Sequence, residues 1–442
     1  MKLAVWSYLL KILLTGVLYY ASIYGWPIFR EYQGIGREGF WVFADDAQAY
    51  HNFGHCMADA WAWQGSFPPI VFENWLFIAY IGLIYSVFGV HPLNVSFLNA
   101  WYGTCIIGAG LVMMRRLGAS ARSIRLGVAL LAFWPSLLLW SSQPMKDPLT
   151  LMLVMLGLCV LVLSLDLQNS RSLTWFWLAG LLGVLLALFR IYAGLVFGVT
   201  MMIAHGWVAI QALRRRAYGF FRKSLAVMVF LPLALFAVTQ LDFQMLINRS
   251  KSEAVGLMPE PAHRPPGLGV VLDQAKAVIA PLTPQALNSL RQGFILTGGH
   301  SLIDPDVTIP SLFKLVAYLP RSLSIAVLAP FPWQWFDVGG RTRAFRAFTA
   351  VEALLVYFLL AGVLGSVWKA YRHLGIQAAG REVRRSLGIQ TVAIWCFIVF
   401  IAVPMSLTVA NLGTLFRLRL QFVLPLAVLA CLVDIPGLYR RR

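Results

Sequence analysis

Two adjacent carboxylates, Asp45 and Asp46, stand in the stretch FADDAQAYHNFGHCMADAW, which covers residues 43–61 and also holds Tyr50. A carboxylate can take a proton from an attacking hydroxyl, so either aspartate is a candidate general base. An aspartate before a helix also accepts a backbone N–H as an N-cap. We expect one of the two to cap the helix that begins near Ala47. Which one carries chemistry, or whether both only cap, stays open from these residues.

A second set of polar residues lies at the ends of apolar runs: Lys146 and Asp147 in SSQPMKDP, Arg190 and Tyr192 in LFRIYAG, and Arg417 and Arg419 in FRLRLQF. Arginine binds phosphate through fixed, charge-assisted hydrogen bonds. Together with a carboxylate base, these residues suit a reaction on an anionic lipid headgroup. Asp147 has a structural alternative, because an aspartate before proline is typical of an N-cap followed by Pro at the first helical position.

His51 and His55 lie one helical turn apart and form a possible metal pair. The alternative is a polar face of an interfacial helix, which we favour. The first loop has no Asp-X-Asp metal motif, so we expect no cofactor, although a divalent metal remains possible.

The composition identifies the class of protein. Of 442 residues, 59% are hydrophobic and 12% charged, and the net charge is +18. Apolar runs long enough to cross a bilayer as helices recur along the chain, which predicts an all-α polytopic membrane protein with membrane lipids around it. The basic excess falls in short loops, where it orients helices, and we expect no nucleic-acid partner. The predicted spans are 5–26, 95–114, 123–141, 148–166, 173–189, 191–212, 224–241, 347–368, 387–408 and 413–433.

Charge also predicts the topology. The basic loops 115–125, 214–223 and 369–385 belong on the cytoplasmic side together with the N-terminus. That parity holds only if the apolar stretch 74–90 is a short interfacial helix, and if 309–335 crosses either not at all or twice. We therefore expect about ten spans (10–12). All the polar end groups above then face the outer side.

The same parity divides the chain into three parts. They are a transmembrane module 1–241 with a first outer loop 27–94, a long outer loop 242–345 with an interfacial or re-entrant segment 309–335, and C-terminal transmembrane helices 346–442.

The order of motifs over about residues 40–155 is similar to a known family. ADDAQAY is followed by the turn GSFPP, an apolar helix ending in FGV, a span ending in MRRLG and the acidic turn SSQPMKD. This order resembles the amino-terminal module of GT-C glycosyltransferases, which include protein O-mannosyltransferases and lipid A aminoarabinose transferase-like enzymes. NLGTLFRLRLQFVLP is similar to the Arg-rich turn and last span of many of these proteins.

The resemblance implies an inverting transferase that takes a sugar from a polyprenyl-phosphate carrier on the extracytoplasmic side. The arginine- and tryptophan-rich composition and the scarcity of Asn-X-Ser/Thr sites favour a bacterial inner membrane as its location. Its first-loop acid falls on Asp45 or Asp46, its second-loop acid on Asp147, and the carboxylate before the juxtamembrane helix on Glu73. The sequence departs from the family where FEN replaces Lys-Pro after that acid, and where Lys146 precedes Asp147.

The roles expected from this reading are a base, Asp45 or Asp46, and a phosphate site. The phosphate-binding candidates are Lys146, Arg190, Tyr192, Arg417 and Arg419, and Tyr50, Glu73 and His300 are further site candidates. The acceptor is a glycan, a lipid or a protein. Two rival hypotheses are a polysaccharide polymerase or ligase that uses a polyprenyl-linked oligosaccharide, and a lipid-headgroup transporter or flippase.

Overall fold

The computed structural model of the chain describes residues 2–27, 30–33, 38–64, 74–166, 171–214, 225, 283–297, 302–335, 347–365, 368 and 388–432. Within these residues the regular structure is helical, and β-type pairing is limited to two isolated bridges, Gln33 to Trp41 and Leu302 to Asn411. The all-α prediction is confirmed for this part of the chain.

Seven of the described helices are long and apolar enough to cross a membrane. They are α1 (Lys2–Tyr24), α4 (Pro92–Arg116), α7 (Asp147–Ser164), α8 (Ser172–Phe189), α9 (Ile191–Arg214), the helix Ala347–Gly365, and α16 (Ile389–Thr408). Two bent pairs raise the number to nine if each is one span: α5 (Ala121–Ala132) with α6 (Pro135–Ser141), and α17 (Leu412–Leu418) with α18 (Leu420–Ala430). All nine match predicted spans. The tenth, 224–241, lies outside the described residues except for Leu225.

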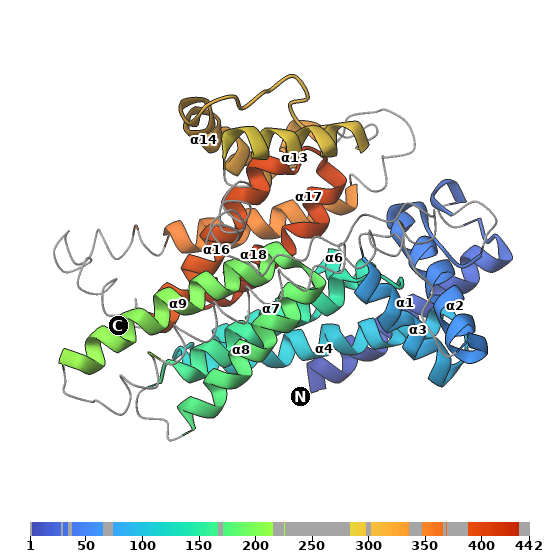
Figure 1. Cartoon of the computed structure of the whole chain (residues 1–442), viewed down its shortest axis with the longest axis horizontal. Helices are drawn as coiled ribbons and strands as arrows, with labels where there is room; N and C mark the ends of the chain where they lie inside the picture. The colour runs from blue at the N-terminus through green and yellow to red at the C-terminus, as the bar shows by residue number, and fades with distance from the viewer. Residues whose placement is uncertain are drawn as a thin grey trace, which may run out of the picture.

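Helix α7 forms the buried centre of the bundle. Its sequence LTLMLVMLGLCVLVLS is apolar on every face, and such a helix is stable only when neighbours enclose it. It packs against α8 and α4, while α9 packs on α8 and α16, and α1 packs on α4. Figure 1 shows α4, α7, α8 and α9 running side by side along the molecule. Because α7, α8 and α9 alternate in direction, the start of α7 meets the junction between α8 and α9.

Helices α2 (Asp45–Gln64) and α3 (Trp75–Phe88) pack together beside one end of this bundle (Figure 1). Glycines allow the close approach: a Cβ on Gly54 would lie 2.4 Å from Ile81 Cγ2, and one on Gly82 would lie 2.6 Å from Met57 Cβ. With 14 residues, α3 is about 21 Å long, shorter than the hydrocarbon core. The prediction that 74–90 does not fully cross agrees with this length.

An outer layer made of α13 (Pro284–Thr297) and α14 (Leu312–Leu328) packs on α16 (Figure 1). The segment 309–335, predicted to be interfacial or re-entrant, thus contains α14 and the short 3-10 helix η4 (Pro332–Gln334). Asp304 ties α14 down, since Arg321 donates to both of its carboxylate oxygens at 2.7 and 2.8 Å. Ile303 N–H donates to Ala410 O at 2.7 Å and so joins this layer to the turn before α17.

Two helix breaks shape the end of the bundle that carries the polar residues. Pro135 starts α6 after a 41° bend from α5, because proline suits a first turn but not a helix interior. Helix α17 meets α18 at a 48° bend at Arg419. Asn411 caps α17, its Oδ1 accepting from Gly413 N–H at 2.8 Å. The second break places Arg417 on the short helix α17.

The close α2–α3 contact gives a stability prediction. We expect Gly54→Ala to lower the free energy of unfolding by about 1–3 kcal/mol, because the new methyl group overpacks against buried Ile81. Gly108→Ala is the matched control, since its Cβ would meet nothing within 4 Å and alanine favours helix by about 1 kcal/mol. Thermal unfolding in detergent measures both. Equal midpoints for the two variants would contradict the packing argument.

Candidate active site

A buried ion pair stands where α7 begins. Asp147, the first residue of α7, is 2% exposed, and Arg190, between α8 and α9, is 7% exposed. Arg190 Nη2 donates to Asp147 Oδ1. Two charges removed from water in this way are tolerated only when they are paired. The antiparallel packing of α7 on α8 is what brings the two residues together.

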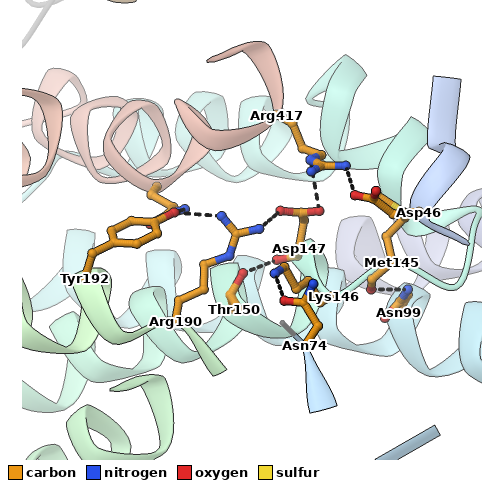
Figure 2. Close-up of polar contacts among 11 residues, drawn as sticks. Asp46, Asn74, Asn99, Met145, Lys146, Asp147, Thr150, Arg190, Tyr192 and Arg417 are labelled. Carbon is orange, nitrogen blue, oxygen red and sulfur yellow. Dashed lines mark hydrogen bonds and ion pairs between the residues drawn. The ribbon is translucent and has the colours of Figure 1, made fainter. Parts of the chain in front are cut away.

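Arg417 joins this pair to the first aspartate stretch. Its Nη1 donates to Asp46 Oδ2 at 2.7 Å, and its Nε lies 3.4 Å from Asp147 Oδ2. Figure 2 shows the Arg417 guanidinium between the two carboxylates, with Asp147 between Arg417 and Arg190. Residues from α2, α7, the α8–α9 junction and α17 therefore form one charged cluster. We call Asp46, Lys146, Asp147, Arg190 and Arg417 the charged cluster.

Tyr192 extends the cluster toward the surface of α9. Its hydroxyl accepts from Arg190 Nη1 at 2.7 Å and from Gln421 Nε2 at 2.9 Å. Burial by itself would lower the pKa of Arg190, but the neighbouring Tyr192 and Asp147 outweigh it and hold that pKa above its ordinary value. Arg190 is a permanent cation.

Lys146 is the titratable member of the cluster. Its Nζ donates to Asn74 Oδ1 at the start of α3. Burial, and then repulsion from Arg190, lower the pKa of Lys146 to about 7 despite the attraction of Asp147. Lys146 can therefore gain or lose its proton near neutral pH, unlike the two arginines.

The turn before α7 is held by a buried amide. Asn99 of α4 donates from Nδ2 to Gln143 O at 2.8 Å and to Met145 O at 3.0 Å. The alternative that Asp147 is the N-cap of α7 is not what the structure has: Lys146 occupies the cap position without a side-chain cap hydrogen bond, and Asp147 and Pro148 are the first two helical residues. The Asp147 carboxylate instead contacts Arg190 and Arg417, whose positive charges offset the free-energy cost of burying it.

Tyr50 of α2 is buried next to the cluster. It is 1% exposed and packs edge-on against Phe77, with ring centroids 5.1 Å apart. Burial, followed by the charges of Asp46 and Asp147, raises its pKa well above the ordinary value, so the phenol stays protonated.

Arg419, predicted to bind phosphate, lies in a different network. Its Nη2 donates to Glu352 Oε1 at 2.8 Å and its Nη1 to Ala329 O at 2.6 Å. The guanidinium also stacks over Phe416 at 3.6 Å, and Arg419 is 1% exposed. The structure thus brings Arg417 into the charged cluster and engages Arg419 elsewhere.

Three other predicted site residues cannot be placed. Glu73 and His300 lie outside the described residues, and of Asp45 only the backbone, as the first residue of α2, is described. Asp46, whose side chain is described, contacts Arg417.

The two histidines of α2 have separate partners. His51 Nδ1 shares a hydrogen bond with Tyr85 OH at 2.7 Å, and His55 Nε2 lies 3.3 Å from Asp59 Oδ2. Burial and the neighbouring His55 lower the pKa of His51 to about 4, so its ring is neutral. In the part of the chain that the structure describes, no three His, Cys, Asp or Glu side chains gather as a metal site would need.

Two contacting residues were missed from the sequence. Asn74 holds Lys146, and Gln421 holds Tyr192. Gln421 left a signal, because a glutamine in an otherwise apolar span is unfavourable unless it has a partner. Asn74 gave no such signal, because an asparagine before a helix is also the usual residue of an N-cap.

The fold and the charged cluster define a polytopic helical membrane protein with a buried ionic site at one end of its bundle. No protein-family model matches the chain, and no curated protein matches it. Two solved structures of ArnT from Cupriavidus metallidurans are similar at low levels. The one bound to undecaprenyl phosphate gives a TM-score of 0.40 at 14% identity and covers 88% of this chain. The apo structure gives 0.33 at 13% identity and covers 89% of this chain and 77% of that one.

The chain spans 59% of the length of the undecaprenyl-phosphate-bound ArnT. At these identities the roles of residues rest on the contacts within this chain itself.

The buried pair gives a second stability prediction. We expect Asp147→Asn to cost about 3–5 kcal/mol of unfolding free energy, because it leaves Arg190 buried without its counter-charge. Asp59→Asn, which breaks an exposed pair with His55, should change stability by less than about 1 kcal/mol. Denaturant unfolding of both purified variants in detergent checks this. An Asp147→Asn protein as stable as the parent would show that the pair is not a structural requirement.

Proposed function

We propose that the chain is a membrane glycosyltransferase of the GT-C type, which moves a sugar from a polyprenyl-phosphate carrier to an acceptor hydroxyl on the extracytoplasmic face. The charged cluster is the observation that carries the proposal. Its three basic residues and two carboxylates sum to one positive charge while Lys146 is protonated. A phosphodiester carries one negative charge and would complete the balance.

The position of the cluster supports a lipid-linked donor. Tyr192 hydrogen-bonds Arg190 and is itself 37% exposed. Farther along α9, Val199, Ile203 and Ile210 lie on the same face of the helix as Tyr192. Their side chains are 48%, 45% and 52% exposed. An apolar chain lying along this stripe would bring its phosphate headgroup to Tyr192 and Arg190.

The two aspartates suit different tasks. The Asp46 side chain is 44% exposed, whereas that of Asp147 is 3% exposed. An acceptor hydroxyl can reach Asp46, so we assign Asp46 as the general base. Asp147 contacts both arginines and holds them in place.

The reaction then follows from these placements. Asp46 takes the proton as the acceptor oxygen attacks the anomeric carbon, and the bond from that carbon to the phosphate oxygen breaks on the opposite face, which inverts the centre. Arg190, Arg417 and protonated Lys146 stabilise the charge that builds on the departing phosphate. The products are the glycosylated acceptor and polyprenyl phosphate.

The first test is transfer from a radiolabelled undecaprenyl-phosphate hexose, with cell-envelope extract as the acceptor. We expect Asp46→Asn to lower kcat by roughly 100-fold or more, because the amide cannot accept the proton. Asp45→Asn is the matched control and should retain most activity. Full activity in both variants and in the double variant would overturn the proposal, and loss in Asp45→Asn alone would move the base to Asp45.

The same assay separates the rival functions. A polymerase or ligase would accept a lipid-linked oligosaccharide and give products of larger size. A flippase would move the donor across vesicle membranes without releasing undecaprenyl phosphate.

Lys146 gives a pH prediction. The pKa of Lys146 is about 7 in the free protein, so its positive charge is present below pH 7 and lost above it. We expect the affinity for a polyprenyl-phosphate hexose to fall roughly tenfold as the pH rises through this range, the loss of one charge-assisted contact. The diester itself does not titrate there. Binding measured from pH 5.5 to 8.5 should lose this dependence in Lys146→Met, and an unchanged profile would contradict the role of Lys146.

A further inference from the structure

We infer that Glu352, a buried carboxylate outside the charged cluster, is a positioning residue that sets Arg417 against Asp147. The inference rests on the proposed function, because it assigns Arg417 a part in the reaction. It also gives Arg419 a role other than phosphate binding.

Glu352 makes contacts to two separate arms of the structure. It lies in the helix Ala347–Gly365 and is 0% exposed. One carboxylate oxygen, Oε1, accepts from Arg419 Nη2 at 2.8 Å and Nε at 3.3 Å. The other, Oε2, accepts from Ser136 N–H at 3.1 Å and from the Ser136 hydroxyl. All of these groups are buried, so water cannot replace either contact.

The first arm leads to Arg417. Arg419 stands at the 48° bend between α17 and α18, two residues after Arg417. Its guanidinium is held by Glu352, by Ala329 O and by the ring of Phe416. A bend held on three sides fixes the direction of the short helix α17. The direction of α17 in turn decides where the Arg417 side chain points.

The second arm leads to Asp147. Ser136 lies in the first turn of α6, where backbone N–H groups lack helical partners, and its N–H donates to Glu352 Oε2 at 3.1 Å. Helix α6 runs to Ser141, and the turn that follows is held by Asn99 and ends at Asp147. A shift of α6 would therefore also move Asp147.

The two arms meet again in the charged cluster, where Arg417 Nε lies 3.4 Å from Asp147 Oδ2. Glu352 is thus connected to the candidate active site by two routes, through Arg419 to Arg417 and through Ser136 to Asp147. An error of about 1 Å in such a site can lower the rate by roughly 100-fold. A buried ion pair is weak evidence for stability, since apolar replacements often stabilise as well. Geometric control is the better explanation for a charge placed at the point where both arms join.

A double-mutant cycle in transfer activity tests the inference. Glu352→Gln should lower kcat roughly 10- to 100-fold with KM changed less than about threefold. If Glu352 acts through Arg417, adding Glu352→Gln to Arg417→Lys should cost less than about threefold more. Equal losses in both backgrounds would show general structural damage and overturn the inference. Unchanged kcat in Glu352→Gln would do the same.

Two further measurements keep the test decisive. If Glu352→Gln does not fold, Glu352→Asp replaces it in the cycle, because it keeps the charge and withdraws the carboxylate by one methylene. The same cycle is also read in the Kd for undecaprenyl phosphate, which needs no turnover and shows the same non-additive pattern if the inference holds.

Controls separate this inference from the proposed function. Arg321→Gln removes an exposed arginine that pairs with Asp304, outside both the charged cluster and the contacts of Glu352, and should retain full activity. Loss of transfer in Arg417→Lys with normal kcat in Glu352→Gln would sink only the positioning role. Normal transfer in Arg417→Lys and in the Asp45→Asn, Asp46→Asn double variant would instead sink the proposed function.

Discussion

The pairing of Asp147 with Arg190 and Arg417 is the interaction on which the rest of the structure depends. Asp147 is 2% exposed, and an unpaired carboxylate at that depth would cost several kcal/mol. Arg190 supplies one counter-charge because α7 and α8 pack antiparallel. Arg417 supplies the second, and to do so α17 must end beside the start of α7. The same contact draws in Asp46 of α2, so one buried carboxylate fixes the relative positions of four elements.

The helix breaks serve this arrangement. Continuous spans would carry their side chains through the bilayer, whereas α6 and α17 are short helices that end among the polar groups. Each break exposes backbone groups that need partners. At the start of α6, Glu352 accepts from the Ser136 N–H. At the other break it is the counter-charge of Arg419. A second, fully buried ion pair, Glu352 with Arg419, thus connects the two bends that create the ionic site.

Much of the fold was predictable because the bilayer imposes length and hydrophobicity directly on the sequence. The seven described spans and two bent pairs follow the apolar runs, and charge parity indicated that 74–90 does not fully cross, which agrees with the 14 residues of α3. The site was predicted less completely. Arg417 and Arg419 look equivalent in FRLRLQF, yet residues two apart on a helix point about 200° from each other. One therefore faces the cluster and the other faces Glu352, and the sequence does not say which.

The sequence by itself determined the class of protein, the spans and the set of ionisable residues at their ends, because each is a local property of composition and position. Tertiary structure alone decided the pairs. Arg417 and Asp46 are 371 residues apart, and only helix packing makes them partners. Asp147 reads as a helix cap in its own segment, but burial between two arginines makes it their counter-charge. Burial and partnership depend on segments distant in the chain, and a local pattern does not contain them.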